Sequence, residues 1–334
     1  KKLLLILLCL PMIGFGQNVN IPDANFKAYL FWNTAINTNG DSEIQVSEAT
    51  NFSDTIDING YYINDLTGIE AFTALTYLYC FNNQITSLNL SQNTALTTLN
   101  CSQNQLTSLD LSQNTALTTL NCTYNQLTSL DLSQNTALTF LDCSKNQITS
   151  LNVSQNTALT YLACMVNQLT ILDVTQNIAL TILVCFNNQL TSLDVSQNTA
   201  LTSFICSYNQ LTSLDLSQNT ALTTLYCQDN QLTSLDSRNG NNQNTWNFGV
   251  SNNPLLTCIN VDNVSYSSTN WTDIDSQHWF STNCPAPVSI EEQTTNKDLL
   301  KVTDLLGGET KGSKNEPLFY IYNDGTVEKR IVIE

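Results

Sequence analysis

The sequence predicts a mainly β fold: a solenoid of stacked coils, capped at both ends and followed by a small β-sandwich domain. The first observation is a fixed period, because the eight cysteines from Cys80 to Cys227 stand 21 residues apart. Repeats of this length are typical of solenoids, in which each repeat adds one coil. The second observation is that threonine-rich segments within each period alternate apolar and polar positions, as strands do. These segments are ten and eleven residues long, which leaves no room for a helix.

The repeated unit occupies residues 71–239 and has two halves. The first half reads Leu-x-x-Leu-x-Cys-x-x-Asn-x, and the second reads Leu-x-x-Leu-x-Leu-x-x-Asn-x-x. Both halves carry the leucine-rich-repeat signature, and the array resembles the nested 21-residue class of bacterial leucine-rich repeats. The resemblance implies a leucine-rich-repeat solenoid with short strands on both sides of each coil and little or no helix. One coil buries too little apolar surface to offset the entropy of ordering its chain, so the coils must stack to fold.

Three columns of identical residues run through the array. The cysteines share one repeat position, so we interpret them as a buried ladder of free thiols. The asparagines are expected to bond backbone groups that the turns leave unpaired. One asparagine column consists of Asn83, Asn104, Asn125, Asn146, Asn167, Asn188, Asn209 and Asn230. The other consists of Asn93, Asn114, Asn135, Asn156, Asn177, Asn198 and Asn219.

The charge of the chain limits its partners. The formal net charge is −17, and only Lys145 and Arg238 are positive between residues 71 and 239. Nucleic acid or an anionic membrane needs a basic stripe, so neither is expected as a partner. A single histidine and buried cysteines place no base beside a nucleophile, so we do not expect an enzyme. The stacked aspartates are interpreted as a solvated stripe, with weak cation binding as the alternative: Asp110, Asp131, Asp173, Asp194, Asp215 and Asp236.

Residues 1–16 are predicted to be a secretory signal peptide. Lys1 and Lys2 precede the apolar run Leu3–Leu10, and Gly14-Phe15-Gly16 follows it, which is the order of regions in such peptides. The apolar run is too short to cross a bilayer, and no other run of 18 apolar residues is present, so no transmembrane segment is expected. The mature protein is therefore expected to be secreted or attached to a cell surface.

Residues 17–70 are predicted to be an N-terminal cap that contains an EF-hand-like loop. Pro22 marks the start of a helix with Phe26 and Leu30 on one face. The loop that follows has oxygen-bearing residues at the positions that ligate Ca²⁺ in such loops: Asn37, Asn39, Asp41, Glu43 (through its carbonyl) and Glu48. Asn37 stands where an acid is usual and Ser42 where a glycine is usual. The alternative to a calcium site is a polar turn.

Residues 240–286 are predicted to be a C-terminal cap. A last strand is expected near residues 255–261, followed by aromatic residues that suit a cap core. Cys258 and Cys284 lie outside the cysteine ladder and are a plausible disulfide pair in an exported protein. His278 and its neighbour Trp279 are interpreted as residues of the cap rather than of a catalytic site.

Residues 287–334 form strand-like segments after a stiff linker, Pro285-Ala286-Pro287. This end resembles the type A C-terminal sorting domain of the type IX secretion system. The matching residues are 301–302, 304–307, the hairpin 319–325 and the terminus 329–334, while Gly308 stands where the family often has arginine. The resemblance implies a Gram-negative source, the type IX secretion machinery as a partner, and release or anchoring of the mature protein at the outer-membrane surface.

The coils differ from one another mainly on the first segment. The second segment is nearly identical in every coil, whereas the outward positions of the first segment vary. A group of these positions is apolar: Tyr161, Met165, Val166, Ile182, Val184, Phe186 and Ile205. Outward apolar groups often mark a binding surface, so we expect a protein or glycan partner here, as in adhesion or recognition. The alternatives are relaxed drift among duplicated coils, a patch covered by a neighbouring segment, and a structural surface spacer without a dedicated ligand.

Overall fold

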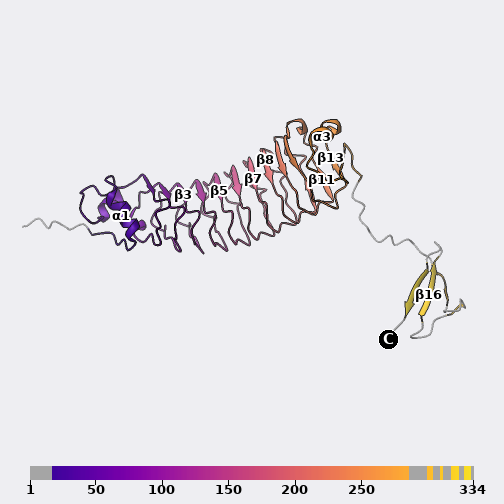
Figure 1. The fold of residues 1–334 in the computed structure, drawn as a ribbon, viewed down its shortest axis with the longest axis horizontal. Helices are drawn as coiled ribbons and strands as arrows, with labels where there is room; N and C mark the ends of the chain where they lie inside the picture. Colours follow the sequence, from indigo (N-terminus) through magenta and orange to yellow (C-terminus); the bar gives the residue numbers. More distant parts are fainter. Residues whose placement is uncertain (1–16, 286–298, 304–308, 311–316, 323–326, 332–334) are drawn as a thin grey trace, which may run out of the picture. The chain divides into compact units, whose positions relative to one another are not determined.

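The structure, a computed structural model, describes residues 17–285, 299–303, 309–310, 317–322 and 327–331. The chain divides into two compact units, residues 1–284 and residues 285–334. The first unit contains the solenoid and both of its caps (Figure 1). The predicted signal peptide lies outside the described residues.

One side of the solenoid is a ten-stranded parallel sheet. Figure 1 shows its strands in a row, one for each coil. In the order of the sheet they are β1 (Thr55–Asp57), β2 (Tyr77–Tyr79), β3 (Thr98–Asn100), β4 (Thr119–Asn121), β5 (Phe140–Asp142), β6 (Tyr161–Ala163), β7 (Ile182–Val184), β8 (Ser203–Ile205), β10 (Thr224–Tyr226) and β12 (Asn247–Gly249). Equivalent residues pair without a shift, for example Leu99 with Leu120. In most strands the middle residue is buried and the outer two are at least partly exposed. Alternate residues of a strand point to opposite faces, so one face of the sheet packs on the core.

The opposite side of the solenoid differs from the prediction of strands on both sides of each coil. Paired strands form there only at the C-terminal end, in a parallel sheet of order β14-β13-β11-β9. These strands are β9 (Ser213–Asp215), β11 (Ser234–Asp236), β13 (Cys258–Asn260) and β14 (Trp279–Ser281). In the described coils before Ser213 the prediction was wrong.

Side chains take over the links between those earlier coils. The amide of Asn114 donates to the carbonyls of Leu90 and Asn93 in the preceding coil, at 3.1 and 2.9 Å. The Leu90 carbonyl also accepts the backbone N–H of Asn93 within its own turn. The two lone pairs of this carbonyl oxygen therefore accept a turn N–H and a side-chain amide, and not an N–H of a neighbouring strand.

The core is continuous from the N-terminal cap to the C-terminal cap. The ladder cysteines Cys80 to Cys227 all have 0% exposure and are free thiols. The first asparagine column connects coils at the end of the sheet: Asn104, for example, accepts the N–H of Ile85 and donates to the carbonyls of Cys80 and Cys101. These contacts confirm the predicted structural role of the column.

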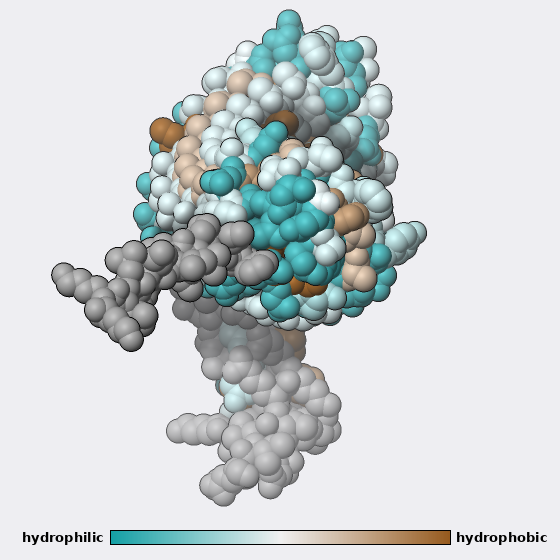
Figure 2. Space-filling model, turned by 90° about the vertical axis from the view of Figure 1, so that its left-hand side faces the viewer, coloured by the Kyte–Doolittle hydropathy of each residue, from teal (hydrophilic) through white to brown (hydrophobic). Residues whose placement is uncertain are grey.

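The N-terminal cap consists of α1 (Ala24–Trp32), α2 (Val46–Asn51) and the 3₁₀ turn η1 (Ile69–Ala71). Helix α1 is capped by Asp23, whose carboxylate accepts the N–H groups of Asn25 and Phe26, and it buries Phe26 and Leu30 completely. From this end the described surface is mostly hydrophilic, with apolar residues in small separate spots (Figure 2). The cap thus covers the end of the core.

Within the described part of the chain no helix is long and apolar enough to cross a bilayer.

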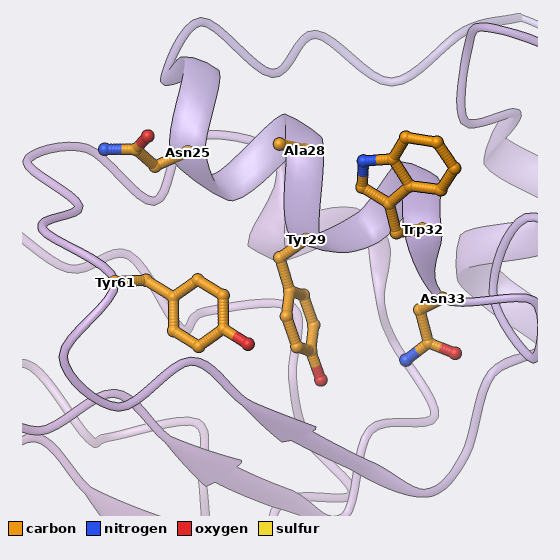
Figure 3. A pocket seen from close by; sticks show the side chains of 6 residues that line it. All are labelled: Asn25, Ala28, Tyr29, Trp32, Asn33 and Tyr61. Carbon is orange, nitrogen blue, oxygen red and sulfur yellow. The ribbon is translucent and has the colours of Figure 1, made fainter.

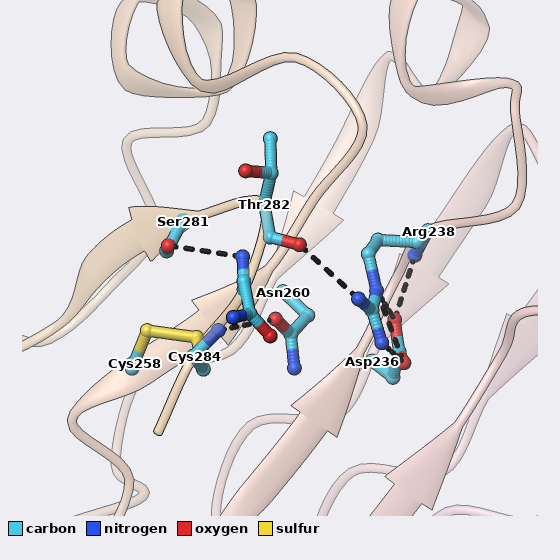
Figure 4. Close-up of a disulfide and its surroundings, with 8 residues drawn as sticks. Asp236, Arg238, Cys258, Asn260, Ser281, Thr282 and Cys284 are labelled. Carbon is cyan, nitrogen blue, oxygen red and sulfur yellow. Dashed lines mark hydrogen bonds and ion pairs between the residues drawn. A yellow bond between two sulfur atoms is a disulfide. The ribbon is translucent and has the colours of Figure 1, made fainter. Parts of the chain in front are cut away.

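The C-terminal cap adds the 3₁₀ turn η2 (Asn242–Asn244) and α3 (Val264–Asn270) to β13 and β14. The predicted pair Cys258 and Cys284 forms a disulfide that ties the end of the unit to β13 (Figure 4). Beside it, Arg238 forms an ion pair with Asp236 and donates to the carbonyl of Thr282 at 3.1 Å. These contacts hold the last strand against the solenoid.

The second unit contains an antiparallel sheet of order β15-β16-β17. Its strands are β15 (Leu299–Thr303), β16 (Pro317–Tyr322) and β17 (Val327–Ile331), and they lie in the region expected to hold strand-like segments. The structure describes one sheet here and not the two of the predicted sandwich. Residues 323–325 of the predicted hairpin, the matching residues 304–307, Gly308 and residues 332–334 lie outside the described residues.

Candidate partner-binding face

The seven apolar residues singled out from the sequence lie together on the outward side of the ten-stranded sheet. The register of β6, β7 and β8 places Tyr161 beside Ile182, and Val184 beside Ile205. Just beyond these strands, the N–H of Val166 donates to the carbonyl of Phe186 at 3.0 Å, so the segments that carry Met165 and Phe186 are also adjacent. All seven side chains are partly exposed. We call this set (Tyr161, Met165, Val166, Ile182, Val184, Phe186 and Ile205) the apolar face.

The apolar face continues onto β5 through an aromatic stack. The rings of Phe140 and Tyr161 are nearly parallel, with their centroids 4.4 Å apart. Asp142, two residues further along β5, is partly buried at this edge, and burial raises the pKa of its carboxyl. Phe140 occupies one of the variable outward positions of the repeat, so its place in the apolar face could have been predicted from the sequence.

At its other edge the apolar face borders a groove with a volume of about 440 Å³. Phe186 and Ile205 line it together with residues outside the predicted binding set: Ser207, Tyr208, Tyr226, Gln228, Asp229, Ser251 and Asn252. Two cap contacts shape this end, since Gln228 donates to Asp273 and Asn252 donates to Asp229, at 2.9 and 3.0 Å. The groove depends on how the C-terminal cap packs, which the repeat pattern does not reveal.

Val166 has an unusual backbone conformation for its residue type. Its φ is 55°, in the left-handed region. That conformation is unfavourable for a β-branched residue, on the order of 1–3 kcal/mol. An apolar side chain is thus presented at the apolar face from a strained position.

The EF-hand-like loop is closed by its own hydrogen bonds. One carboxylate oxygen of Glu48 accepts the N–H groups of Thr38 and Asn39, at 2.8 and 3.2 Å, and the other accepts the N–H of Gln45. Asn37 accepts the N–H of Gly40.

The remaining predicted ligands are also engaged. The side-chain oxygen of Asn39 accepts the N–H of Asp41 at 2.8 Å, and the carboxylate of Asp41 accepts the N–H of Glu43 at 2.8 Å. The carbonyl of Glu43 accepts the side-chain amide of Gln45 at 3.5 Å. The residue types suit a hard cation, but these hydrogen bonds within the loop are also those expected of a polar turn. A cation would compete with the loop amides for the carboxylate of Glu48, and calcium binding stays a prediction.

The aspartates of the column are exposed except Asp236, which is partly buried, and Asp215 and Asp236 are the last residues of β9 and β11. Each carboxylate accepts an N–H two residues ahead, as Asp110 does from Ser112 and Asp131 from Ser133, both at 2.9 Å. These hydrogen bonds lower the pKa of both carboxyls. The column therefore has a local structural role in closing its turns.

The ladder thiols and the histidine are buried in packing roles. Burial raises the pKa of Cys101 and of Cys185 to about 12, and it raises the pKa of the other six ladder thiols as well. A thiol with so high a pKa is not a nucleophile at neutral pH. His278 is buried, and its Nδ1 accepts the N–H of Asp275 at 3.1 Å within the cap.

Comparison with known proteins identifies the repeat. The family model described as "Leucine Rich repeats (2 copies)" matches residues 73–114. The solenoid is built of leucine-rich repeats. No functionally curated protein shows significant similarity to the sequence.

Solved structures of bacterial leucine-rich-repeat proteins share the fold. The functional domain of InlJ from Listeria monocytogenes, described as including a cysteine ladder, is 37% identical with a TM-score of 0.65, over 79% of this chain and 60% of that one. The leucine-rich-repeat protein LIC12759 of Leptospira interrogans is 22% identical with a TM-score of 0.53, over 70% of this chain and 62% of that one. Internalin C2 of L. monocytogenes is 22% identical with a TM-score of 0.52, over 65% of this chain and 90% of that one. The chain thus spans about three fifths of the length of the first two proteins, and the last two similarities show the fold alone.

Proposed function

We propose that this protein is a recognition protein that binds a protein partner through the apolar face. The observation that carries the proposal is the change of chemistry along one regular sheet. On β3 and β4 the outward positions hold Thr98, Asn100, Thr119 and Asn121, whereas on β6 to β8 the same positions are mainly apolar. The middle residue of each of these strands is fully buried and apolar in both regions, so the core does not require this difference.

The surroundings of the apolar face favour a protein segment as its partner. Aromatic and aliphatic side chains at its centre can receive apolar anchors, and the groove at its edge offers depth for a larger side chain. Asp142 and Asp229 stand at opposite edges of this region, and the chain as a whole is strongly acidic. The complementary partner has apolar anchors flanked by basic residues, since opposite charges steer association.

Export to a cell surface is part of the proposal and rests on the sequence. The signal-peptide pattern of residues 1–16 and the resemblance of residues 287–334 to type IX sorting domains support a secreted or surface-attached protein of a Gram-negative bacterium. The strands β15 to β17 are compatible with such a domain. A glycan at the apolar face and a spacer role without a ligand are the competing functions.

A charge-insertion experiment tests the proposal. The full chain is immobilised and offered to proteins from cell surfaces and culture fluid. We expect saturable capture of a protein that is lost when Phe186→Asp and Ile205→Asp are introduced together, because two carboxylates would be desolvated in the contact.

The matched control is the pair Ile171→Asp and Ile178→Asp, which changes two exposed isoleucines outside the apolar face. This control should keep the captured protein. Equal capture by both double variants would rule out the apolar face, and capture that a soluble glycan abolishes would favour the glycan alternative.

A further inference from the structure

A pocket on the N-terminal cap is separate from the apolar face and has a distinct chemistry. Its volume is about 440 Å³, within the range of roughly 300–1,000 Å³ typical of small-molecule sites. Figure 3 shows the side chains that line it: Asn25, Ala28, Tyr29, Trp32 and Asn33 from α1 and its end, and Tyr61 from the loop after β1. The site therefore belongs to the cap, before the regular coils begin.

Aromatic rings form much of the pocket, and they are exposed beyond what the cap core requires. The side chain of Trp32 is 78% exposed and that of Tyr61 is 46% exposed. Tyr29 and Tyr61 meet edge to face, with ring centroids 5.5 Å apart. The hydroxyl of Tyr29 accepts the N–H of Asp57 at 3.1 Å, which holds this ring against β1. The wall is thus rigid on one side and open to solvent on the other.

Polar groups surround the rings without adding charge. None of the six lining residues is Asp, Glu, Lys, Arg or His, and burial raises the pKa of the Tyr29 hydroxyl. The Asn25 amide nitrogen donates to the carbonyl of Tyr62 at 3.2 Å, which orients its oxygen. Within the described part of the chain, no protein group pairs with the Asn25 oxygen, the Trp32 indole N–H or the Tyr61 hydroxyl. The pocket thus offers both hydrogen-bond donors and acceptors beside flat apolar surfaces.

We propose that this pocket binds a neutral saccharide. A sugar ring has an apolar C–H face that can lie on an aromatic ring, and hydroxyls at its rim that both donate and accept hydrogen bonds. The absence of a lining charge disfavours acidic sugars and charged peptides. A proline-rich segment also packs on aromatic rings, but its backbone offers carbonyl acceptors and almost no donors. It therefore has almost no group that could donate to the Asn25 oxygen.

Calorimetric titration of the full chain with neutral oligosaccharides tests the proposal. The probes are hexasaccharides of β-1,4-glucose, β-1,3-glucose, α-1,4-glucose, β-1,4-xylose and α-1,6-mannose, with a proline-rich peptide as the competing ligand. We expect saturable heat with at least one saccharide. Trp32→Ala should weaken that binding about tenfold or more, the scale of one stacked aromatic contact, while Trp32→Phe should keep most of it.

The matched control is Trp246→Ala, which removes a tryptophan that is 74% exposed at the C-terminal cap. It should leave saccharide affinity unchanged, as should the charge insertions in the apolar face. A failure of the partner-binding proposal is therefore distinguishable from a failure of this one. No saturable saccharide heat at millimolar concentration, binding of the proline-rich peptide alone, or equal loss in Trp32→Ala and Trp246→Ala would each overturn the proposal.

Discussion

Each coil places one residue in the left-handed backbone region, two positions after its cysteine. The φ angles at these positions lie between 52° and 56° for the eight ladder coils, at Asn82, Gln103, Tyr124, Lys145, Val166, Asn187, Tyr208 and Asp229. Asparagine tolerates this conformation better than other non-glycine residues, and a β-branched side chain tolerates it worst. The sequence pattern did not reveal this position, because its residue types vary and glycine is absent from it.

The strain at this position leads to a stability prediction. Val166→Asn should raise the free energy of unfolding by about 1 kcal/mol, because asparagine relieves the left-handed penalty. Urea denaturation followed by circular dichroism measures the change. The reverse substitution at the next coil, Asn187→Val, should destabilise by a similar amount. A loss of stability in Val166→Asn would mean that contacts of the valine side chain outweigh its backbone strain.

At the scale of elements, the loop between α1 and α2 carries the calcium prediction. If the loop binds Ca²⁺, calorimetry of the full chain with calcium should show one site that Glu48→Ala abolishes, since this residue would supply the bidentate carboxylate. Glu43→Ala should retain the site, because that residue would use its backbone carbonyl. Absence of binding heat with the unaltered chain would leave the polar turn as the only role of the loop.

The elements also show how far the sequence could predict the fold. The period, the buried cysteine ladder, the first-side strands and the strands of the second unit follow from spacing and residue type. The absence of strands on the opposite side of the described coils before Ser213 could not be predicted in this way. A threonine-rich segment with alternating apolar residues is compatible with a strand whether or not a neighbouring backbone is within hydrogen-bonding distance. The short helices α2 and α3 were missed because their polar sequences lack a helical apolar period.

The candidate sites were predictable to different degrees for a related reason. The apolar face was found because it interrupts a repeat whose coils can be compared with one another. The groove beside Tyr226 and the pocket beside Tyr29 were missed, because each is formed by segments far apart in the chain. Tyr61, for example, meets Tyr29 only through the packing of α1 over the first coil.

At the scale of the molecule, the ladder thiols link stability to alkaline pH. A folded thiol such as Cys101 keeps its proton up to about pH 12, whereas an unfolded one has the ordinary pKa of 9.0. Between these values the unfolded state binds fewer protons than the folded state, so the stabilising contribution is complete below pH 9 and falls as pH rises. The decrease is about 1.4 kcal/mol per pH unit for each thiol.

We therefore expect the unfolding free energy to fall steeply above pH 9, and Cys101→Ala or Cys185→Ala to make the slope shallower by the share of one thiol. Denaturation curves from about pH 8 to about pH 11 provide the measurement. The comparison uses slopes, so a constant loss from the smaller side chain does not affect it. Identical slopes in the variants and the unaltered chain would show that the thiols do not control alkaline unfolding.

The unshifted pairing of equivalent residues gives the solenoid the symmetry of a one-dimensional lattice. Asn135 bonds the carbonyls of Leu111 and Asn114 in the same way as Asn156 bonds those of Leu132 and Asn135. Removing or duplicating a 21-residue unit in the polar region before β5 would therefore restore the same contacts across the junction. Each such event moves the cap pocket relative to the apolar face by one lattice step of ~4.8 Å. Gene-level slippage among these repeats could thus tune the spacing between the two proposed binding sites without altering either of them.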